Sequence, residues 1–200
     1  MKKEVVLVFQ KNEVLGKVKT RLASGMGELR ALEIYRHLVQ STYSVLEDVS
    51  APVWTYYSDF IPEKVNPLIE KSFVQEGQDL GERMANAFAR SFESGMEKVV
   101  LIGTDCPTLQ SQHLSKAFEA LTHSDLVLGP AIDGGYYLIG MKCRADYLFE
   151  GIAWSTAEVL SQTLAVASAN GLDFTLLDEL SDIDTQEDWE SYSSQFEITR

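Results

Sequence analysis

A basic, glycine-containing segment follows the first apolar run of the sequence. It reads KNEVLGKVKTRL, residues 11–22, and its cationic side chains are Lys11, Lys17, Lys19 and Arg21. Cationic side chains neutralise phosphate charge, and a glycine such as Gly16 lets the backbone approach an anion closely. The order of residues matches neither the P-loop nor the dinucleotide-binding fingerprint. The segment therefore indicates either a phosphate-binding loop of another kind or a solvated basic loop.

A single carboxylate follows a second apolar run. Residues 99–102, VVLI, are typical of a buried strand, and Asp105 comes shortly after them, two positions before Pro107. Asp is a hard oxygen ligand suited to Mg²⁺, which usually takes one or two protein carboxylates together with substrate phosphates. Asp105 is therefore a candidate metal ligand. The alternative is that it caps the helix that follows.

Two further carboxylates stand near the end of the chain. Asp182 and Asp184 occur in SDIDTQEDW, residues 181–189, directly after the last predicted strand. They could meet Asp105 as the second carboxylate of a metal site. Alternatively, Asp184 and its neighbours Thr185 and Glu187 cap the last helix.

The segment GPAIDGGYYLIG, residues 129–140, combines turn residues with aromatic side chains. Asp133, Gly134 and Gly135 are strong turn formers, so a hairpin turn is one interpretation. An acid beside two tyrosines, of which Tyr136 is the first, would also suit a hydroxyl-rich ligand. Both interpretations place this segment between two strands.

Composition excludes several classes of protein. The net charge of -13 argues against nucleic acid as a partner, yet residues 1–21 hold six Lys/Arg against two acids, which favours a small anionic ligand. No apolar run has the length of a membrane span, and MKKEVVLVFQ is too short for a signal-peptide core. Cys106 and Cys143 have no metal spacing. We therefore expect a cytoplasmic protein with reduced thiols, no membrane partner, and one domain covering residues 1–200.

Alternating apolar patterns predict the elements that position these residues. Strand-like runs occur at 4–10, 52–58, 72–76, 98–104, 125–131, 136–141 and 173–178. Helical periodicity occurs at 28–49, 80–92, 111–121, 156–168 and 185–195. Ser155 followed by Glu158 suggests a capping box that opens the fourth of these helices.

This order of elements predicts an α/β domain with a mostly parallel sheet covered on both faces. The short connection between 125–131 and 136–141 permits only an antiparallel pair of strands or a sharp bend, and it therefore indicates a mixed sheet. Ligands of such sheets bind beyond the carboxyl ends of the strands. The loops at 11–27 and after 98–104 should therefore share one edge.

Six motifs in order resemble a known bacterial family. They are GKVKTRL, GQDLGERM, GTDCP, DGGYYLIG, WST and DIDTQEDW. Across roughly residues 4–190 the chain resembles a bacterial GT-A-like transferase family of unknown function, of the type associated with radical SAM or selenium-related domains. That family is similar to the nucleotide-diphospho-sugar transferase superfamily. The resemblance implies a Rossmann-like three-layer α/β/α sandwich with a mixed, mostly parallel sheet.

The resemblance also implies roles for individual residues. The phosphate-binding loop would include Gly16, Lys17, Lys19 and Arg21. Residues near the nucleotide would be Gln78, Asp79, Gly81 and Arg83. The acceptor or sugar side would be lined by Asp133, Gly134, Gly135 and Tyr136. The metal, Mg²⁺ or Mn²⁺, would be held by Asp105 and Asp184, with Asp182 as a further candidate. Catalytic roles would fall to Lys17, Lys19, Arg21 and Asp105.

Two departures from the family pattern affect the expected activity. The paired DxD acids of many GT-A glycosyltransferases are missing, because Asp105 is followed by Cys106 and Pro107, and the glycine-rich opening before Gly16 is only partly present. We expect a metal-dependent transferase with a nucleotide substrate. The first hypothesis is nucleotidyl transfer from a nucleoside triphosphate to a small phosphorylated acceptor. The alternatives are glycosyl transfer from a nucleotide sugar and a non-catalytic nucleotide-binding module.

Overall fold

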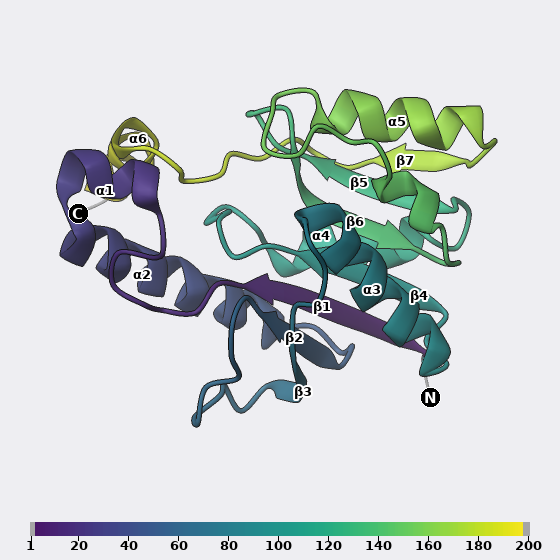
Figure 1. The fold of residues 1–200 in the computed structure, drawn as a ribbon, viewed down its shortest axis with the longest axis horizontal. Helices are drawn as coiled ribbons and strands as arrows, with labels where there is room; N and C mark the ends of the chain where they lie inside the picture. The colour runs from purple at the N-terminus through teal and green to yellow at the C-terminus, as the bar shows by residue number, and fades with distance from the viewer. Residues whose placement is uncertain (1–2, 198–200) are drawn as a thin grey trace.

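The computed structural model describes residues 3–197, and its centre is one seven-stranded mixed sheet (Figure 1). The strands are β1 (Glu4–Gln10), β2 (Val53–Tyr57), β3 (Ile69–Val74), β4 (Lys98–Ile102), β5 (Leu126–Pro130), β6 (Tyr136–Met141) and β7 (Phe174–Leu176). Their order across the sheet is β3-β2-β1-β4-β6-β5-β7. Strand β6 runs antiparallel to both neighbours, and every other pairing is parallel.

The central strands are continuous apolar runs because both of their faces are covered. In β1, Val5 to Val8 are all fully buried, and they pair in register with the apolar residues of β4. The antiparallel pairing of β5 with β6 confirms the prediction from their short connection. All seven predicted strands are present, although β3 begins three residues earlier than predicted.

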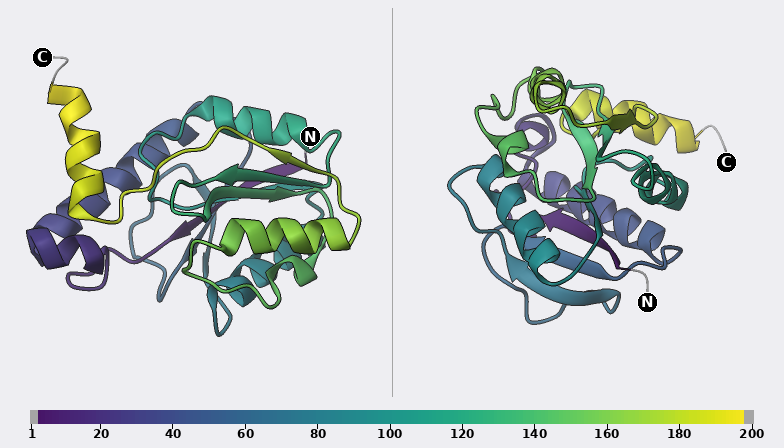
Figure 2. Two further views of the ribbon diagram at one scale, coloured as in Figure 1. Left: turned by 90° about the horizontal axis from the view of Figure 1, so that it is seen from above. Right: turned by 90° about the vertical axis from the view of Figure 1, so that its right-hand side faces the viewer.

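Helices cover the two faces of this sheet, as Figure 2 shows most clearly in its left view. The helices are α1 (Thr20–Met26), α2 (Glu28–Leu46), α3 (Leu80–Glu93), α4 (Ser111–Ala120), α5 (Val159–Ala169) and α6 (Gln186–Glu197), with a short 3₁₀ helix, η1 (Asp146–Phe149). Buried side chains of α2 and α4 pack on one face. Those of α3, α5 and η1 pack on the other. This is the predicted three-layer α/β/α arrangement.

A third, smaller cluster of apolar side chains lies beyond the carboxyl end of β1. Leu22 of α1, Ile34 and Leu38 of α2, and Ile183 are fully or almost fully buried there, with Trp189 of α6 packed against them. Figure 1 shows α1 and α6 together at one end of α2. This cluster joins the basic segment near residue 20 to the acidic segment near residue 184.

Two local predictions were wrong. The segment 11–27 is not entirely loop, because α1 forms within it. No side chain caps α1, and its stabilisation comes from tertiary contacts of Leu22, which local sequence patterns do not reveal. The predicted capping box at Ser155 is also absent: α5 begins at Val159, and Ser155 has a φ of 64°. There the Thr156 hydroxyl accepts a hydrogen bond from the Glu158 amide and forms a turn instead.

The other predicted helices are confirmed within a few residues at each end. None of the helices described between residues 3 and 197 combines the length and apolar character needed to cross a membrane.

Candidate functional site

A cavity of about 690 Å³ opens where the loops after several strands meet. These loops follow β1, β4, β5 and β7, which run parallel and therefore end at the same edge of the sheet. Its wall contains cationic and anionic side chains, namely Lys11, Lys19, Arg21, Arg83, Asp105, Asp133, Asp182 and Asp184. Basic and acidic residues far apart in sequence thus share one hollow at the edge predicted to bind a ligand.

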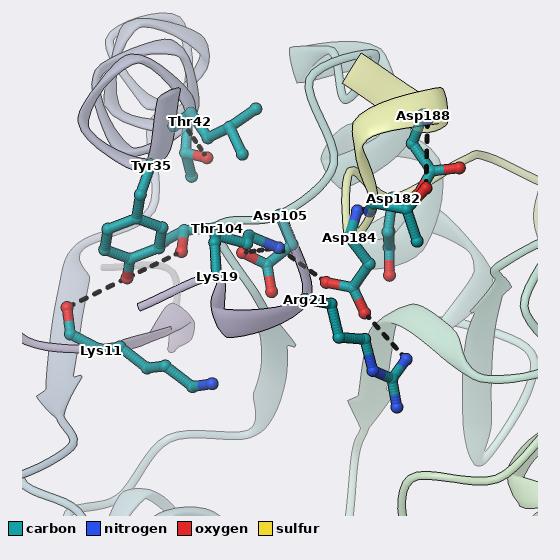
Figure 3. A network of polar contacts seen from close by, with 12 residues as sticks. Lys11, Lys19, Arg21, Tyr35, Thr42, Thr104, Asp105, Asp182, Asp184 and Asp188 are labelled. Carbon is teal, nitrogen blue, oxygen red and sulfur yellow. Dashed lines mark hydrogen bonds and ion pairs between the residues drawn. The ribbon is translucent and has the colours of Figure 1, made fainter. Parts of the chain in front are cut away.

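Lys19 forms the centre of the polar network in this cavity (Figure 3). Its Nζ lies 2.9 Å from Oδ1 of Asp105 and 2.9 Å from Oδ1 of Asp184. Only 5% of the Lys19 side chain is exposed, against 42% for Asp105 and 46% for Asp184. Burial alone lowers the pKa of Lys19, but the charges and hydrogen bonds of the two carboxylates outweigh it and raise the pKa above its ordinary value. Lys19 is therefore a nearly buried cation between two acids, and those acids favour its charged form.

The backbone directs Lys19 into the cavity. Its φ of 48° and ψ of 49° are left-handed, and it is the residue immediately before α1. Such a conformation is unfavourable for a residue with a Cβ, and it persists only where surrounding contacts impose it. Here the Lys19 carbonyl accepts from the Ala23 amide while the side chain holds the two acids.

Asp105 is fixed by the loop after β4. Its carbonyl accepts a hydrogen bond of 2.9 Å from the Ile183 amide, which ties this loop to the acidic segment. On its other side the Thr104 hydroxyl contacts Tyr35, whose hydroxyl donates to the Lys11 carbonyl at 3.0 Å. Asp105 does not cap the next helix, because α4 begins after Gln110 with a capping box closed by His113. Its carboxylate is therefore available to the cavity.

Asp184 is likewise not the cap of the last helix. Asp188 accepts hydrogen bonds from the amides of Asp184 and Thr185, and the Thr185 hydroxyl accepts from the Asp188 amide. The Asp184 carboxylate faces the cavity, where its Oδ2 lies 3.6 Å from Nη1 of Arg21.

Asp182 differs from its neighbours because its Oδ1 atom is buried without a hydrogen-bond partner among the described residues. Burial raises the pKa of this carboxyl to about 7, helped by the negative charges of Asp105 and Asp133, while Lys19 opposes the shift. An unpaired buried carboxyl oxygen in a functional cavity is a position where a cation or a polar ligand group would be accommodated.

The Asp133–Gly135 segment forms the hairpin turn between β5 and β6 and also lines the cavity. Asp133 Oδ1 accepts from the Gly135 amide at 2.9 Å, and Gly134 has a φ of 89°. Gly134 packs so closely against residue Ala157 that a Cβ would lie 2.1 Å from its carbonyl oxygen. The cavity wall includes Asp133, Gly135 and Tyr136. The turn and the ligand-lining interpretations are therefore compatible.

The remaining predicted residues divide between the cavity and its surroundings. Arg83 lies on the cavity wall and donates from Nε to the Gly77 carbonyl, whereas Asp79 caps α3 by accepting from the Glu82 amide. Gly81 packs against Trp154. The following predicted residues are not part of the cavity wall: Gly16, Lys17, Gln78, Asp79, Gly81 and Gly134.

Several cavity residues were not predicted as site residues. They include Ser58, Gln75, Trp154, Ser155 and Thr156, while Lys11, which the sequence indicated only as part of the basic segment, also lines the cavity. Ser58 and Gln75 directly follow β2 and β3, so the rule that ligands bind at carboxyl ends of strands could have identified them. Trp154 and Ser155 belong to the WST motif, which the sequence indicated only as a helix start.

The donor set is compatible with a single Mg²⁺ or Mn²⁺ completed by a substrate. Within residues 3–197 no group of three or more His, Cys, Asp or Glu side chains is arranged to hold a metal ion. However, the Oδ1 atoms of Asp105 and Asp184 converge on one cationic nitrogen, and Oδ1 of Asp182 is unpartnered nearby. Mg²⁺ commonly uses only one or two carboxylates and takes its other ligands from phosphates and water, so these residues fit such an ion.

Comparison with known proteins supports a common fold and family. Residues 61–156 match the bacterial family DUF2064, described as uncharacterized proteins conserved in bacteria. A solved structure from Desulfovibrio desulfuricans G20, described as a candidate nucleotide-diphospho-sugar transferase, is 34% identical, with a TM-score of 0.86 over 92% of this chain and 84% of that one.

More distant similarities involve nucleotide-using enzymes. A 2-phospho-L-lactate guanylyltransferase from Methanocaldococcus vulcanius is 21% identical over 142 residues, which are 70% of this chain and 64% of that protein. The chain therefore spans less than two thirds of this curated relative.

Two solved structures share the fold at low identity. A CMP-2-keto-3-deoxy-manno-octonic acid synthetase solved with CTP has a TM-score of 0.59 and 10% identity over 98% of this chain and all of that one. A Mycobacterium tuberculosis protein solved with manganese has a TM-score of 0.58 and 11% identity over 94% of this chain and 96% of that one. From the 34% identity and the coverage of both chains, we conclude that this chain belongs to the same family as the Desulfovibrio protein described as a candidate nucleotide-diphospho-sugar transferase.

Proposed function

We propose that the protein transfers a nucleotidyl group from a nucleoside triphosphate to a small phosphorylated acceptor, with Mg²⁺ or Mn²⁺ as cofactor. The observation that carries this proposal is the convergence of Lys19, Asp105 and Asp184 in a cavity that Lys11, Arg21 and Arg83 also line. A phosphate-rich substrate needs such cations, and a bound metal needs such carboxylates.

In this reaction an acceptor oxygen forms a bond to the α-phosphorus, and the bond from that phosphorus to the β-phosphate oxygen breaks. Pyrophosphate leaves with the electrons of the broken bond. Negative charge develops on the phosphoryl oxygens, and preorganised cations such as Lys11 and Arg21 would stabilise it. No protein nucleophile is required. Consistent with this, burial raises the pKa of the Cys106 thiol to about 11, so it is protonated near neutral pH.

The metal would be held by Asp105 and Asp184, with Asp182 as a further candidate ligand. When bound, it would supply Lewis-acid stabilisation of the phosphate oxygens. Lys19 and Arg21 both approach the Asp184 carboxylate and would place cationic charge beside the phosphates. Asp133, Gly135 and Tyr136 line the same cavity and would face the acceptor.

Two relatives support a nucleotide substrate. One is named a guanylyltransferase, and another was solved with CTP. The description of the Desulfovibrio relative favours a second candidate, glycosyl transfer from a nucleotide sugar. The two thiols, one of them buried, are compatible with the proposed cytoplasmic location.

An assay of pyrophosphate release separates these functions. In separate reactions, the protein would be incubated with each nucleoside triphosphate or each nucleotide sugar, together with Mg²⁺ and a pool of small phosphorylated compounds. Acceptor-dependent pyrophosphate release supports nucleotidyl transfer. Turnover only with nucleotide sugars would support glycosyl transfer, and binding without turnover would contradict both enzymatic proposals.

A pair of variants tests the role of the basic segment through nucleotide affinity, measured by calorimetry. Arg21→Ala should weaken nucleotide binding by roughly 10-fold or more, as expected for one charge-assisted contact of about 1.5–3 kcal/mol. Lys116→Ala is the matched control, because Lys116 pairs with Asp178 on the surface and does not line the cavity. Equal nucleotide affinity of the two variants by calorimetry would remove the phosphate role from Arg21.

A further inference from the structure

The Lys19 side chain occupies the point at which one cation would contact both Asp105 and Asp184. Its Nζ lies 2.9 Å from Oδ1 of each acid, and the network is visible in Figure 3. A Mg²⁺ ion bound through these same two Oδ1 atoms would lie about 2.0–2.1 Å from each of them. The ammonium and the metal ion therefore cannot hold both oxygens at the same time.

Lys19 has both an unfavourable backbone conformation and an almost fully buried side chain in this arrangement. Between residues 3 and 197, Lys19 and Ser155 are the two residues other than glycine with positive φ. A long cationic side chain that is 95% buried gives up both hydration and rotamer freedom, since only 5% of it remains exposed. An incidental surface ion pair would need neither feature. The geometry thus favours a defined role for Lys19 between the acids.

We propose that Lys19 is the resident cation of the Asp105–Asp184 pair in the nucleotide-free protein, and that a divalent metal ion binds only by displacing its ammonium group. The inference rests on the metal-dependent function proposed above. Nucleotide phosphates would give the displaced ammonium a new anionic partner. Metal and nucleotide affinities are then coupled, and each raises the affinity for the other by the same factor.

This exchange predicts that loss of the Lys19 ammonium increases the affinity of the nucleotide-free protein for metal. With Lys19 in place, free metal must compete with an internal cation, so nucleotide-free protein binds it weakly. Removing the ammonium leaves two half-exposed carboxylates, at 42% and 46%, that water can solvate without loss of the fold. The vacated pair should then bind metal without nucleotide.

The test measures Mn²⁺ binding to nucleotide-free protein, by the loss of the electron paramagnetic resonance signal of free Mn²⁺. Lys19→Met should bind Mn²⁺ at least 10-fold more tightly than the wild type. The control is Lys116→Met, which removes the same charge from another Lys–Asp pair with a 2.7 Å contact outside the cavity. Its Mn²⁺ affinity should equal that of the wild type. Equal affinity of Lys19→Met and the wild type, or no Mn²⁺ binding by folded Lys19→Met, would overturn the proposal.

A second measurement uses the wild type and does not depend on the folding of a variant. Lysine acylation, read by mass spectrometry, should increase several-fold at Lys19 when saturating Mn²⁺ is added, while acylation of exposed Lys116 stays constant. Unchanged acylation of Lys19 would contradict displacement. If pyrophosphate release remained metal-dependent in that case, only this inference would fail. Absence of acceptor-dependent release would instead reject the proposed function.

Discussion

At the scale of single residues, the site depends on how charges are paired. Lys19 compensates two acids at once, Arg21 approaches one of them, and Asp182 has one carboxyl oxygen without a hydrogen-bond partner in the described part of the chain. A charged side chain that is almost fully buried is stable only when groups of opposite charge lie beside it. A substitution that changes one charge but not the shape of its side chain should therefore separate function from folding.

Asp105→Asn is the substitution that makes this separation. The amide preserves the side-chain shape, and the backbone contact from Ile183 to residue 105 does not involve the side chain. We expect an intact fold and a rate loss on the order of 10²–10³, as for removal of one preorganised electrostatic group. Pyrophosphate release and thermal unfolding would be measured in parallel with Asp178→Asn, which alters a surface pair. Similar rates for the two variants would exclude Asp105 from the reaction.

The turn between β5 and β6 provides a residue-scale test of stability. Gly134→Ala would force a Cβ to within 2.1 Å of the Ala157 carbonyl oxygen at a φ of 89°. We expect a decrease of about 1–3 kcal/mol or more in the free energy of unfolding. Gly135→Ala is the control, since its Cβ would approach only the Asp133 side chain, at 3.2 Å, and its φ is not positive. Equal urea midpoints would contradict the close packing at Gly134.

At the scale of secondary-structure elements, the helices α4 and α6 are capped by residues other than the acids that line the cavity. Gln110 and His113 close the start of α4, and Thr185 with Asp188 closes the start of α6. Because these residues satisfy the first amides of each helix, Asp105 and Asp184 are not needed as caps. Capping and the proposed metal binding therefore use different residues of the same segments.

The cap of α4 predicts a pH effect on stability. His113 Nδ1 accepts from the Gln110 amide at 3.0 Å, and burial, followed by the charge of Lys116, lowers the pKa of His113 below 6.5. The unfolded chain takes up this proton at higher pH than the folded one. The stabilisation is therefore complete above pH 6.5 and is lost as the pH falls through the lower folded-state pKa.

His113→Gln should weaken this dependence, because an amide oxygen can accept the same hydrogen bond without titrating. Urea unfolding at pH 7 and pH 5 should show a smaller loss of stability for His113→Gln than for the wild type. Substitution of exposed His123 by Gln controls for general effects of losing a histidine. A loss as large as that of the wild type would mean that His113 does not titrate differently in the folded state.

At the scale of the whole molecule, one sheet and three apolar clusters connect every element that supports the site. Clusters on the two faces of the sheet meet the helices α2, α3, α4 and α5, and the third joins α1, α2 and α6. Lys19 and Asp184, which are 165 positions apart, meet across this framework. The site should therefore persist only while the complete domain is folded.

We accordingly predict that the chain unfolds as one cooperative domain. Its three tryptophans lie in β2, before α5 and in α6, so their fluorescence reports on distant parts of the molecule. Urea unfolding followed by fluorescence and by far-ultraviolet circular dichroism should give coincident transitions. Two separate midpoints, with α6 lost first, would show instead that the cluster around Trp189 folds independently.

The sequence by itself determined the order of the strands and of the helices other than α1 and η1, and it predicted the edge of the sheet at which a ligand would bind. Apolar runs such as residues 99–102 and turn residues such as Asp133–Gly135 are local signals, and each indicates the conformation of its own segment. The short connection after β5 left only an antiparallel β6 or a sharp bend, and the structure shows the antiparallel pair. Carboxylates placed just after strands then pointed to Asp105 and Asp184, because the ends of parallel strands share one edge.

Only the tertiary structure decided how the charged residues of that edge are used. The sequence predicts the same phosphate-binding role for Lys17, Lys19 and Arg21. In the structure, however, Lys17 is exposed outside the cavity, whereas Lys19 is buried between two acids. Helix α1 also forms without a local cap, through contacts of Leu22 with segments far away in the chain. The direction of a loop side chain and the stability of a short helix depend on such distant contacts, whose geometry is absent from any local pattern of residues.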